Sequence, residues 1–181
     1  MRKTITVNWL NKINACSDAV EAFKYQKETD SIKVLKGAMK IDRFDWANWL
    51  IARLMNRKQK LAYSIFAAES VIDIFEKKYP DDKRPRNAIE AAKKVLKSDT
   101  KKNRAAAYSA ASSAAYSASS AAYSAAYSAD SAYYADSAAD SASSAAYSAA
   151  YSADSASSAR KKLQKKIINY GIKLLAQTIL Q

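Results

Sequence analysis

Residues 61–79, LAYSIFAAESVIDIFEKKY, decide the fold class, because their apolar side chains recur at steps of three and four residues. This stripe consists of Leu61, Ile65, Ala68, Ile72, Phe75 and Tyr79. Such spacing is typical of an amphipathic helix with one buried face. Pro80 follows, and a proline interrupts the hydrogen bonding of a helix. The stretch therefore predicts one helix that runs from residue 61 to residue 79.

The composition of the whole chain favours an all-α fold. Only two glycines and two prolines occur in 181 residues, and a β-rich fold of this length would need many more turn residues. Further helices are expected over residues 18–25, 31–39 and 46–54, and from about Pro85 onward. Asp30 is the expected N-terminal cap of the second of these helices.

The side chains that are missing exclude most catalytic chemistry. The sequence has no histidine and one cysteine, Cys16, so it offers neither a histidine base nor a zinc site built on His or several Cys. Gly37 and Gly171 are the only glycines, which excludes a glycine-rich phosphate loop. Cys16 lies beside alanines, and we expect it to be buried and inert. We therefore predict a non-enzymatic protein with no catalytic residue, no metal site and no cofactor.

The charge is unevenly distributed and divides the chain into three parts. The net charge is +13; residues 1–104 carry 24 basic and 13 acidic side chains, residues 105–159 carry four Asp and no basic residue, and residues 160–181 carry six basic residues. We predict a basic helical domain, a low-complexity helical segment and a basic C-terminal helix with these bounds. A basic body favours anionic partners, although solubility alone would also explain it.

Residues 105–159 contain 25 Ala, 18 Ser, eight Tyr and four Asp, and no other residue type. Alanine occupies 14 of the 15 positions reached from residue 107 to residue 156 by alternating steps of four and three. A repeat of 3.5 residues held in phase for so long predicts one long helix, with shorter helical hairpins or disorder as alternatives. Such a serine-rich helix needs a partner helix, from the same chain or from a second copy in a homo-oligomer. The predicted self-association seam includes Ala111, Ala114, Ala118, Ala121, Ala125 and Ala132.

The last segment, residues 160–181, has the pattern of a basic amphipathic helix. Its apolar residues recur along one side, and Arg160, Lys161 and Lys162 open it. Docking of this helix onto the core is the more common arrangement, and binding to a membrane surface is the alternative. No apolar run is long enough for a membrane span, and the N-terminus lacks the apolar centre of a signal peptide. A cytoplasmic location is expected.

Three motifs together resemble a known family. They are residues 14–19 (NACSDA), residues 45–53 (DWANWLIAR) and residues 79–92 (YPDDKRPRNAIEAA), followed by the alanine-rich tract. This order resembles the immunity proteins of bacterial polymorphic toxin systems, whose relatives also occur in phages. The resemblance extends over residues 10–97, and over the tract by composition only. It implies a protein that neutralises a toxin, or an immune effector as an anti-defence protein, by binding it.

The second motif supplies the first group of candidate binding residues. Trp46, Trp49 and Arg53 are separated by three and four residues, so they share one face of a helix. The guanidinium group of Arg53 can stack on the indole ring of Trp49. Aromatic rings combined with arginines would suit a nucleotide, through stacking and phosphate contacts.

The third motif supplies the second group, Tyr79, Asp81, Arg84 and Arg86. The two arginines flank Pro85 at a predicted helix start, where cationic side chains oppose the helix dipole and require negative charge nearby. Internal carboxylates are the first possible source, and a phosphate or carboxylate of a ligand or partner is the second. The internal candidates are Glu69, Asp73, Glu76, Asp81 and Asp82.

Two functional hypotheses follow. In the first, the chain is an inhibitor that occludes a bacterial toxin or immune effector protein. In the second, it is a sponge that sequesters an anionic nucleotide signal in a Trp/Arg pocket. Nucleic-acid binding is not expected from the sequence, because no motif for it occurs and the acidic tract opposes wrapping of a polyanion.

Overall fold

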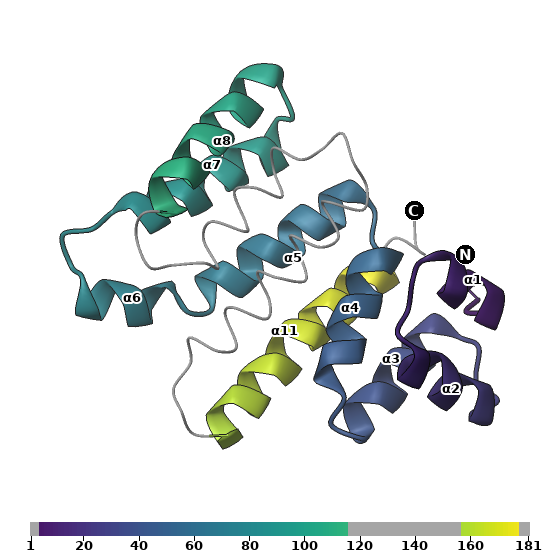
Figure 1. Ribbon diagram of the computed structural model, residues 1–181. Coiled ribbons are helices and arrows are strands. Elements are labelled where there is room, and N and C mark those ends of the chain that lie inside the picture. The colour runs from purple at the N-terminus through teal and green to yellow at the C-terminus, as the bar shows by residue number, and fades with distance from the viewer. Residues whose placement is uncertain (1–3, 116–156, 178–181) are drawn as a thin grey trace.

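The computed structural model describes residues 4–115 and 157–177, and these residues form an α-helical fold without a β-strand (Figure 1). The all-α prediction is confirmed. The helices are α1 (Val7–Lys12), α2 (Ser17–Tyr25), α3 (Ser31–Lys40), α4 (Phe44–Leu54), α5 (Arg57–Glu69), α6 (Ile72–Lys78), α7 (Arg84–Lys97), α8 (Lys101–Ala115) and α11 (Ser157–Gln177).

Local signals in the sequence set several of the helix starts. The Asp30 carboxylate accepts hydrogen bonds from the backbone N–H groups of Ile32 and Lys33, as expected for the cap of α3. Asn56 and Gln59 form a reciprocal capping box at the start of α5. Pro85 lies in the first turn of α7, where its missing N–H costs nothing.

The predicted helix over residues 61–79 is wrong in one respect, because the chain breaks it into α5 and α6. The Oγ of Ser70 donates a hydrogen bond to the carbonyl of Phe66 at 2.8 Å, and such side-chain bonds compete with helix continuation. Val71 then leaves the helical region, with φ −133° and ψ −6°. The spacing of the apolar residues stays helical across the break. The break therefore could not be predicted from that spacing.

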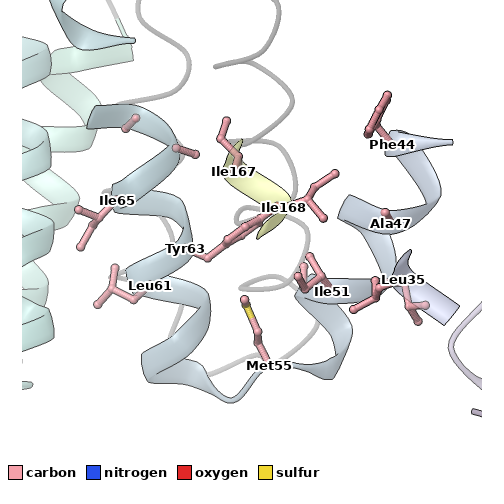
Figure 2. Close-up of a cluster of buried hydrophobic side chains, with 14 of the residues drawn as sticks. Leu35, Phe44, Ala47, Ile51, Met55, Leu61, Tyr63, Ile65, Ile167 and Ile168 are labelled. Carbon is pink, nitrogen blue, oxygen red and sulfur yellow. The ribbon is translucent and has the colours of Figure 1, made fainter. Parts of the chain in front are cut away.

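The main core lies where α11 packs against α4 and α5. Ile167 and Ile168 of α11 are buried there, and Figure 2 shows them between α5 and α4, with Ile168 beside Tyr63. The expected docking of the C-terminal helix onto the core is therefore confirmed. Helices that are far apart in sequence therefore form one core.

The first alanine of the predicted 3.5-residue repeat packs inside the chain. Helix α8 lies along α7, and Ala107, the first position of the repeat, is buried at their contact. Ala111 and Ala114 belong to α8, whereas Ala118, Ala121, Ala125 and Ala132 lie outside the described residues. Helix α8 begins at Lys101 and α11 begins at Ser157, so both helices extend beyond the bounds that the charge pattern gave.

The packing of the helices gives a simple order across the molecule. Helix α7 packs on α5, α5 on α11, α11 on α4, and α4 on α3, while α1 packs on α2 (Figure 1). None of the described helices is both long and apolar enough to cross a membrane.

Candidate functional site

The four N-terminal helices line a half-open cavity of about 380 Å³. It opens between α1, α2, α3 and the first half of α4. Its walls are almost entirely apolar, and its few polar groups lie in the turn between α1 and α2 and at the start of α4. The lining residues are Leu10, Asn14, Ala15, Cys16, Ala19, Phe23, Val34, Ala38, Arg43, Asp45, Trp46, Trp49 and Leu50.

Two of the predicted binding residues, Trp46 and Trp49, line this cavity and are half-buried. The guanidinium of Arg53 lies 3.9 Å from the ring centroid of Trp49, so the predicted stacking is present. Arg53 also donates a hydrogen bond to the Trp49 carbonyl at 3.4 Å. It therefore supports one wall from behind, without lining the cavity itself.

A second arginine, Arg43, covers the other tryptophan, and the sequence analysis missed it. Its guanidinium lies 3.4 Å from the ring centroid of Trp46. The same group makes a bidentate pair with Asp45, with Nε to Oδ1 at 3.0 Å and Nη2 to Oδ2 at 2.7 Å. Hydrogen bonding to Arg43 lowers the pKa of Asp45 and raises that of Arg43. The charged groups at the edge of the cavity therefore neutralise each other.

One polar atom beside the cavity is unsatisfied. The indole Nε1 of Trp46 is shielded from solvent and has no hydrogen-bond acceptor among the described residues. A buried donor without an acceptor costs about 1–3 kcal/mol. Natural proteins keep few such groups, so this one calls for an explanation.

The turn between α1 and α2 forms part of the rim. Asn14 adopts a left-handed conformation with φ 55°, which asparagine tolerates better than most residues. Cys16 follows at the start of α2 and is exposed. The expectation that Cys16 is buried is therefore wrong, because the chain turns at this point and the helical pattern begins only after it.

The other predicted group lies at the corner between α6 and α7. Arg84 makes a bidentate pair with Asp82, with Nε to Oδ1 at 2.9 Å and Nη2 to Oδ2 at 2.7 Å. Arg86 pairs with Glu76, with Nε to Oε1 at 2.7 Å, and reaches Asp73 at 3.4 Å. Internal carboxylates thus supply the negative charge that the two arginines require. These hydrogen bonds lower the pKa of Asp82 and of Glu76.

The same corner presents apolar surface to solvent. Ile74 is 47% exposed and Tyr79 is 43% exposed. The ring of Phe75 lies 5.0 Å from that of Tyr79. We call Ile74, Phe75, Tyr79, Arg84 and Arg86 the α6–α7 corner. Asp81 is exposed beside it, while Glu69 pairs with Lys93 of α7 at 2.7 Å.

The structure therefore separates the predicted site residues into two groups. The two tryptophans and Arg53 lie on α4, and Tyr79, Asp81, Arg84 and Arg86 lie at the α6–α7 corner, beyond α5 (Figure 1). Neither Arg84 nor Arg86 lines the tryptophan cavity. Within residues 4–115 and 157–177, no cluster of three or more Cys, Asp or Glu could hold a metal ion.

Comparison with known proteins decides the family. A family model described as Imm-5 like putative immunity protein matches residues 51–177. The chain belongs to this family. The match begins in the middle of α4 and includes the α6–α7 corner and α11, so the immunity-protein resemblance is confirmed over this part. The cavity lining ends at Leu50 and lies wholly before the matched residues.

The other two comparisons add no relative. A search of curated proteins and a search of solved structures each returned no match. Membership of the immunity-protein family therefore rests on the match over residues 51–177. That match gives an immunity role and does not name the toxin.

Proposed function

We propose that this chain is a cytoplasmic immunity protein that neutralises a toxin or an immune effector by binding to it, without catalysis. The observation that carries the proposal is the family match over residues 51–177, which includes an exposed apolar corner with two arginines. The nearby carboxylates Asp73, Glu76 and Asp82 are engaged in ion pairs, which leaves them poorly placed for acid–base chemistry.

The α6–α7 corner has the composition of a protein-binding surface. Tyrosine and arginine are enriched among the residues that dominate binding energy at protein interfaces. Ile74 and Tyr79 expose apolar area between them, and Arg84 keeps 49% of its side chain exposed. Because Asp82 and Glu76 hold the two guanidinium groups in place, little side-chain entropy would be lost on binding.

Charge gives the kind of partner that fits this corner. The chain carries a net charge of +13, and Lys77 and Lys83 are exposed on either side of Tyr79. Complementary charge steers association and selects among partners. We therefore expect a partner with an acidic face around an apolar centre.

A pull-down from host cells with matched tyrosine variants tests the proposal. Tyr79→Ala is expected to reduce partner capture and to weaken binding of the captured partner by about tenfold or more, as for loss of an interface hot spot. Tyr25→Ala is the control, since Tyr25 is 80% exposed on α2, away from the corner. Equal capture by both variants would exclude the corner as the binding surface. Absence of any protein partner would contradict neutralisation by binding.

Nucleotide sequestration is the second candidate function, because two tryptophans and Arg43 line one cavity, although a phosphate there would have to displace Asp45 from Arg43. The sponge hypothesis predicts a rise in melting temperature with cyclic nucleotides or ADP-ribose derivatives. Loss of that rise in Trp46→Ala would place the ligand in the cavity. Loss in Arg84→Ala or Arg86→Ala would place it at the α6–α7 corner. No shift with any nucleotide would contradict this candidate.

We also propose that the chain forms a homo-oligomer through the alanine repeat. The support is the 3.5-residue period of the sequence, held in phase from residue 107 to residue 156. Light scattering coupled to gel filtration should show the oligomer in the wild type and its loss in an Ala111→Glu, Ala114→Glu double variant. Ala105→Glu with Ala106→Glu, at exposed positions of the same helix, is the control. A monomeric wild type would contradict the proposal.

A further inference from the structure

The cavity between α1 and α4 opens to the surface, and hollows of about 320 and 310 Å³ occur elsewhere among the described residues. Its lining sets it apart, because the lining is almost entirely apolar and includes two tryptophans. The opposite side of α4 has the dense packing that is typical of protein interiors. At Gly171 of α11 an added methyl group would lie 2.6 Å from Cδ1 of Ile51. On α4, one residue before Ile51, the side chain of Leu50 lines a space of about 380 Å³. That volume falls within the range of small-molecule sites.

The walls of the cavity define the chemistry of its occupant. Leu10, Phe23 and Leu50 are nearly buried, and the small side chains of Ala19 and Ala38 leave the room between them. The two half-buried indole rings add flat aromatic surface, against which another ring packs favourably. An aromatic molecule would therefore be more favourably bound than an aliphatic chain of the same size.

The charges at the rim define the net charge of the occupant. Arg43 and Asp45 are the charged residues that line the cavity, and they are joined by two hydrogen bonds. A ligand anion would have to compete with Asp45 for Arg43, and a ligand cation would have to compete with Arg43 for Asp45. Transfer of a charged group into apolar surroundings without a partner is costly. An uncharged ligand meets neither cost.

We propose that this cavity is a binding site for an uncharged aromatic small molecule. The site is separate from the α6–α7 corner, lies outside the family-matched residues, and does not depend on the proposed function. It differs from a nucleotide site because Arg43, the cation among the described residues that line it, is already paired with Asp45. A partner's aromatic side chain is the competing occupant, and the experiment below distinguishes it.

Two fluorescent probes that differ by one charged group test the proposal. N-phenyl-1-naphthylamine is uncharged, and 8-anilino-1-naphthalenesulfonate has the same rings with an added sulfonate. Titration of the purified full chain should give saturable, one-to-one binding of the uncharged probe, tighter than that of the anion by about tenfold or more. The net charge of +13 would by itself give the opposite order, so tighter binding of the sulfonate would overturn the proposal.

Filling the cavity from two different helices identifies the site. Ala19→Leu on α2 and Ala38→Leu on α3 should each weaken binding of the uncharged probe by about tenfold or more, with a melting temperature equal to or above that of the wild type. Ala22→Leu, on α2 but not in the lining, should bind the probe as the wild type does. Two filling variants keep the test valid if one fails to fold.

Several outcomes would overturn the inference. These are no saturable binding of the uncharged probe, unchanged binding in both filling variants, or an equal loss in Ala22→Leu. Binding of the probe only after a captured protein partner has been removed would assign the cavity to that partner's side chain instead. In each case the free small molecule is excluded as the occupant.

Discussion

The two faces of α4 show opposite kinds of packing within one helix. On one face Ala47 and Ile51 are fully buried against their neighbours, and Ile51 leaves no room for a methyl group on Gly171. On the other face Trp46 and Trp49 line a space of about 380 Å³. The family match begins at Ile51 of the packed face. The residues that line the cavity end at Leu50, before the match begins.

This difference separates residues that stabilise the fold from residues that are available for binding. Loss of atoms on the packed face leaves voids or unsatisfied polar groups, and both are costly. Added atoms on the hollow face fill existing space. The predictions below run from the largest expected effect on stability to the smallest. The first three test the packed face, each with a residue elsewhere as its control, and the last tests the α6–α7 corner.

The largest effect is expected from Ile168→Ala in α11. Ile168 is 2% exposed in the contact with α4 and α5, so the substitution should lower the free energy of unfolding by about 2–5 kcal/mol. Urea denaturation followed by circular dichroism measures this change. Ile41→Ala, at a position 62% exposed, should change it by less than about 0.5 kcal/mol. Similar losses in both variants would contradict the packing of α11.

A smaller effect is expected from Tyr63→Phe. The Tyr63 hydroxyl donates a hydrogen bond to Oδ1 of Asn48 at 2.8 Å, and both side chains are buried. Its removal deprives a buried acceptor on α4 of this donor and should cost about 1–3 kcal/mol by the same denaturation measurement. Tyr25→Phe, at an exposed tyrosine, is the control and should be neutral. A neutral Tyr63→Phe would show that the hydrogen bond does not tie α5 to α4.

Smaller changes in the free energy of unfolding are expected when each glycine is replaced by alanine, and the two changes should have opposite signs. In Gly171→Ala the new methyl group would lie 2.6 Å from Ile51 Cδ1 and 2.8 Å from Tyr63 Cε2. Overpacking should destabilise the fold by about 1–3 kcal/mol, and the higher helix propensity of alanine should restore about 1 kcal/mol. The expected net loss of stability is therefore up to about 2 kcal/mol. Gly37→Ala in α3 meets nothing within 4 Å and should gain up to about 1 kcal/mol. Stabilisation by both would mean that α11 does not approach α4 so closely.

The smallest effect is expected from Glu76→Gln at the α6–α7 corner, and it should depend on pH. Arg86 lowers the pKa of Glu76 below the usual 4.5, so the folded state favours the ionised carboxylate. This contribution to stability is present above about pH 4.5 and is lost as the pH falls through the lowered pKa. Melting temperatures of wild type and variant should therefore differ at pH 7 and converge in acid. A difference that persists at low pH would contradict this origin.

Features that depend on neighbours in sequence could be predicted. The Asp30 cap, the stacking of Arg53 on Trp49 and the Pro85 helix start all follow from spacings of a few residues. The carboxylates that neutralise Arg86 were also foreseeable, since Glu76 lies on the preceding helix. The cap, the stacking and the helix start are decided within a few residues, whereas the Arg86–Glu76 pair also needs the turn that brings α6 and α7 together.

Features that depend on the arrangement of several helices could not be predicted. The cavity needs four helices to diverge by the right amount, and only in that setting do Arg43 and Asp45 become its rim. Sequence spacing suggested that tryptophans and arginines form one site, yet α5 and α11 lie between α4 and α7. The break at Ser70 was missed because the apolar stripe keeps its phase through it.

The place of α11 in the core has a consequence for how the protein is made. The Nε2 of Gln59 donates to the carbonyl of Leu174 at 2.6 Å, across 115 positions of sequence. A ribosome therefore releases α4 and α5 long before the helix that covers them, and Ile51 and Tyr63 stay open to chaperones or to aggregation during that interval. Premature termination within residues 116–156 would yield a chain of more than half length that lacks the helix needed to close its core.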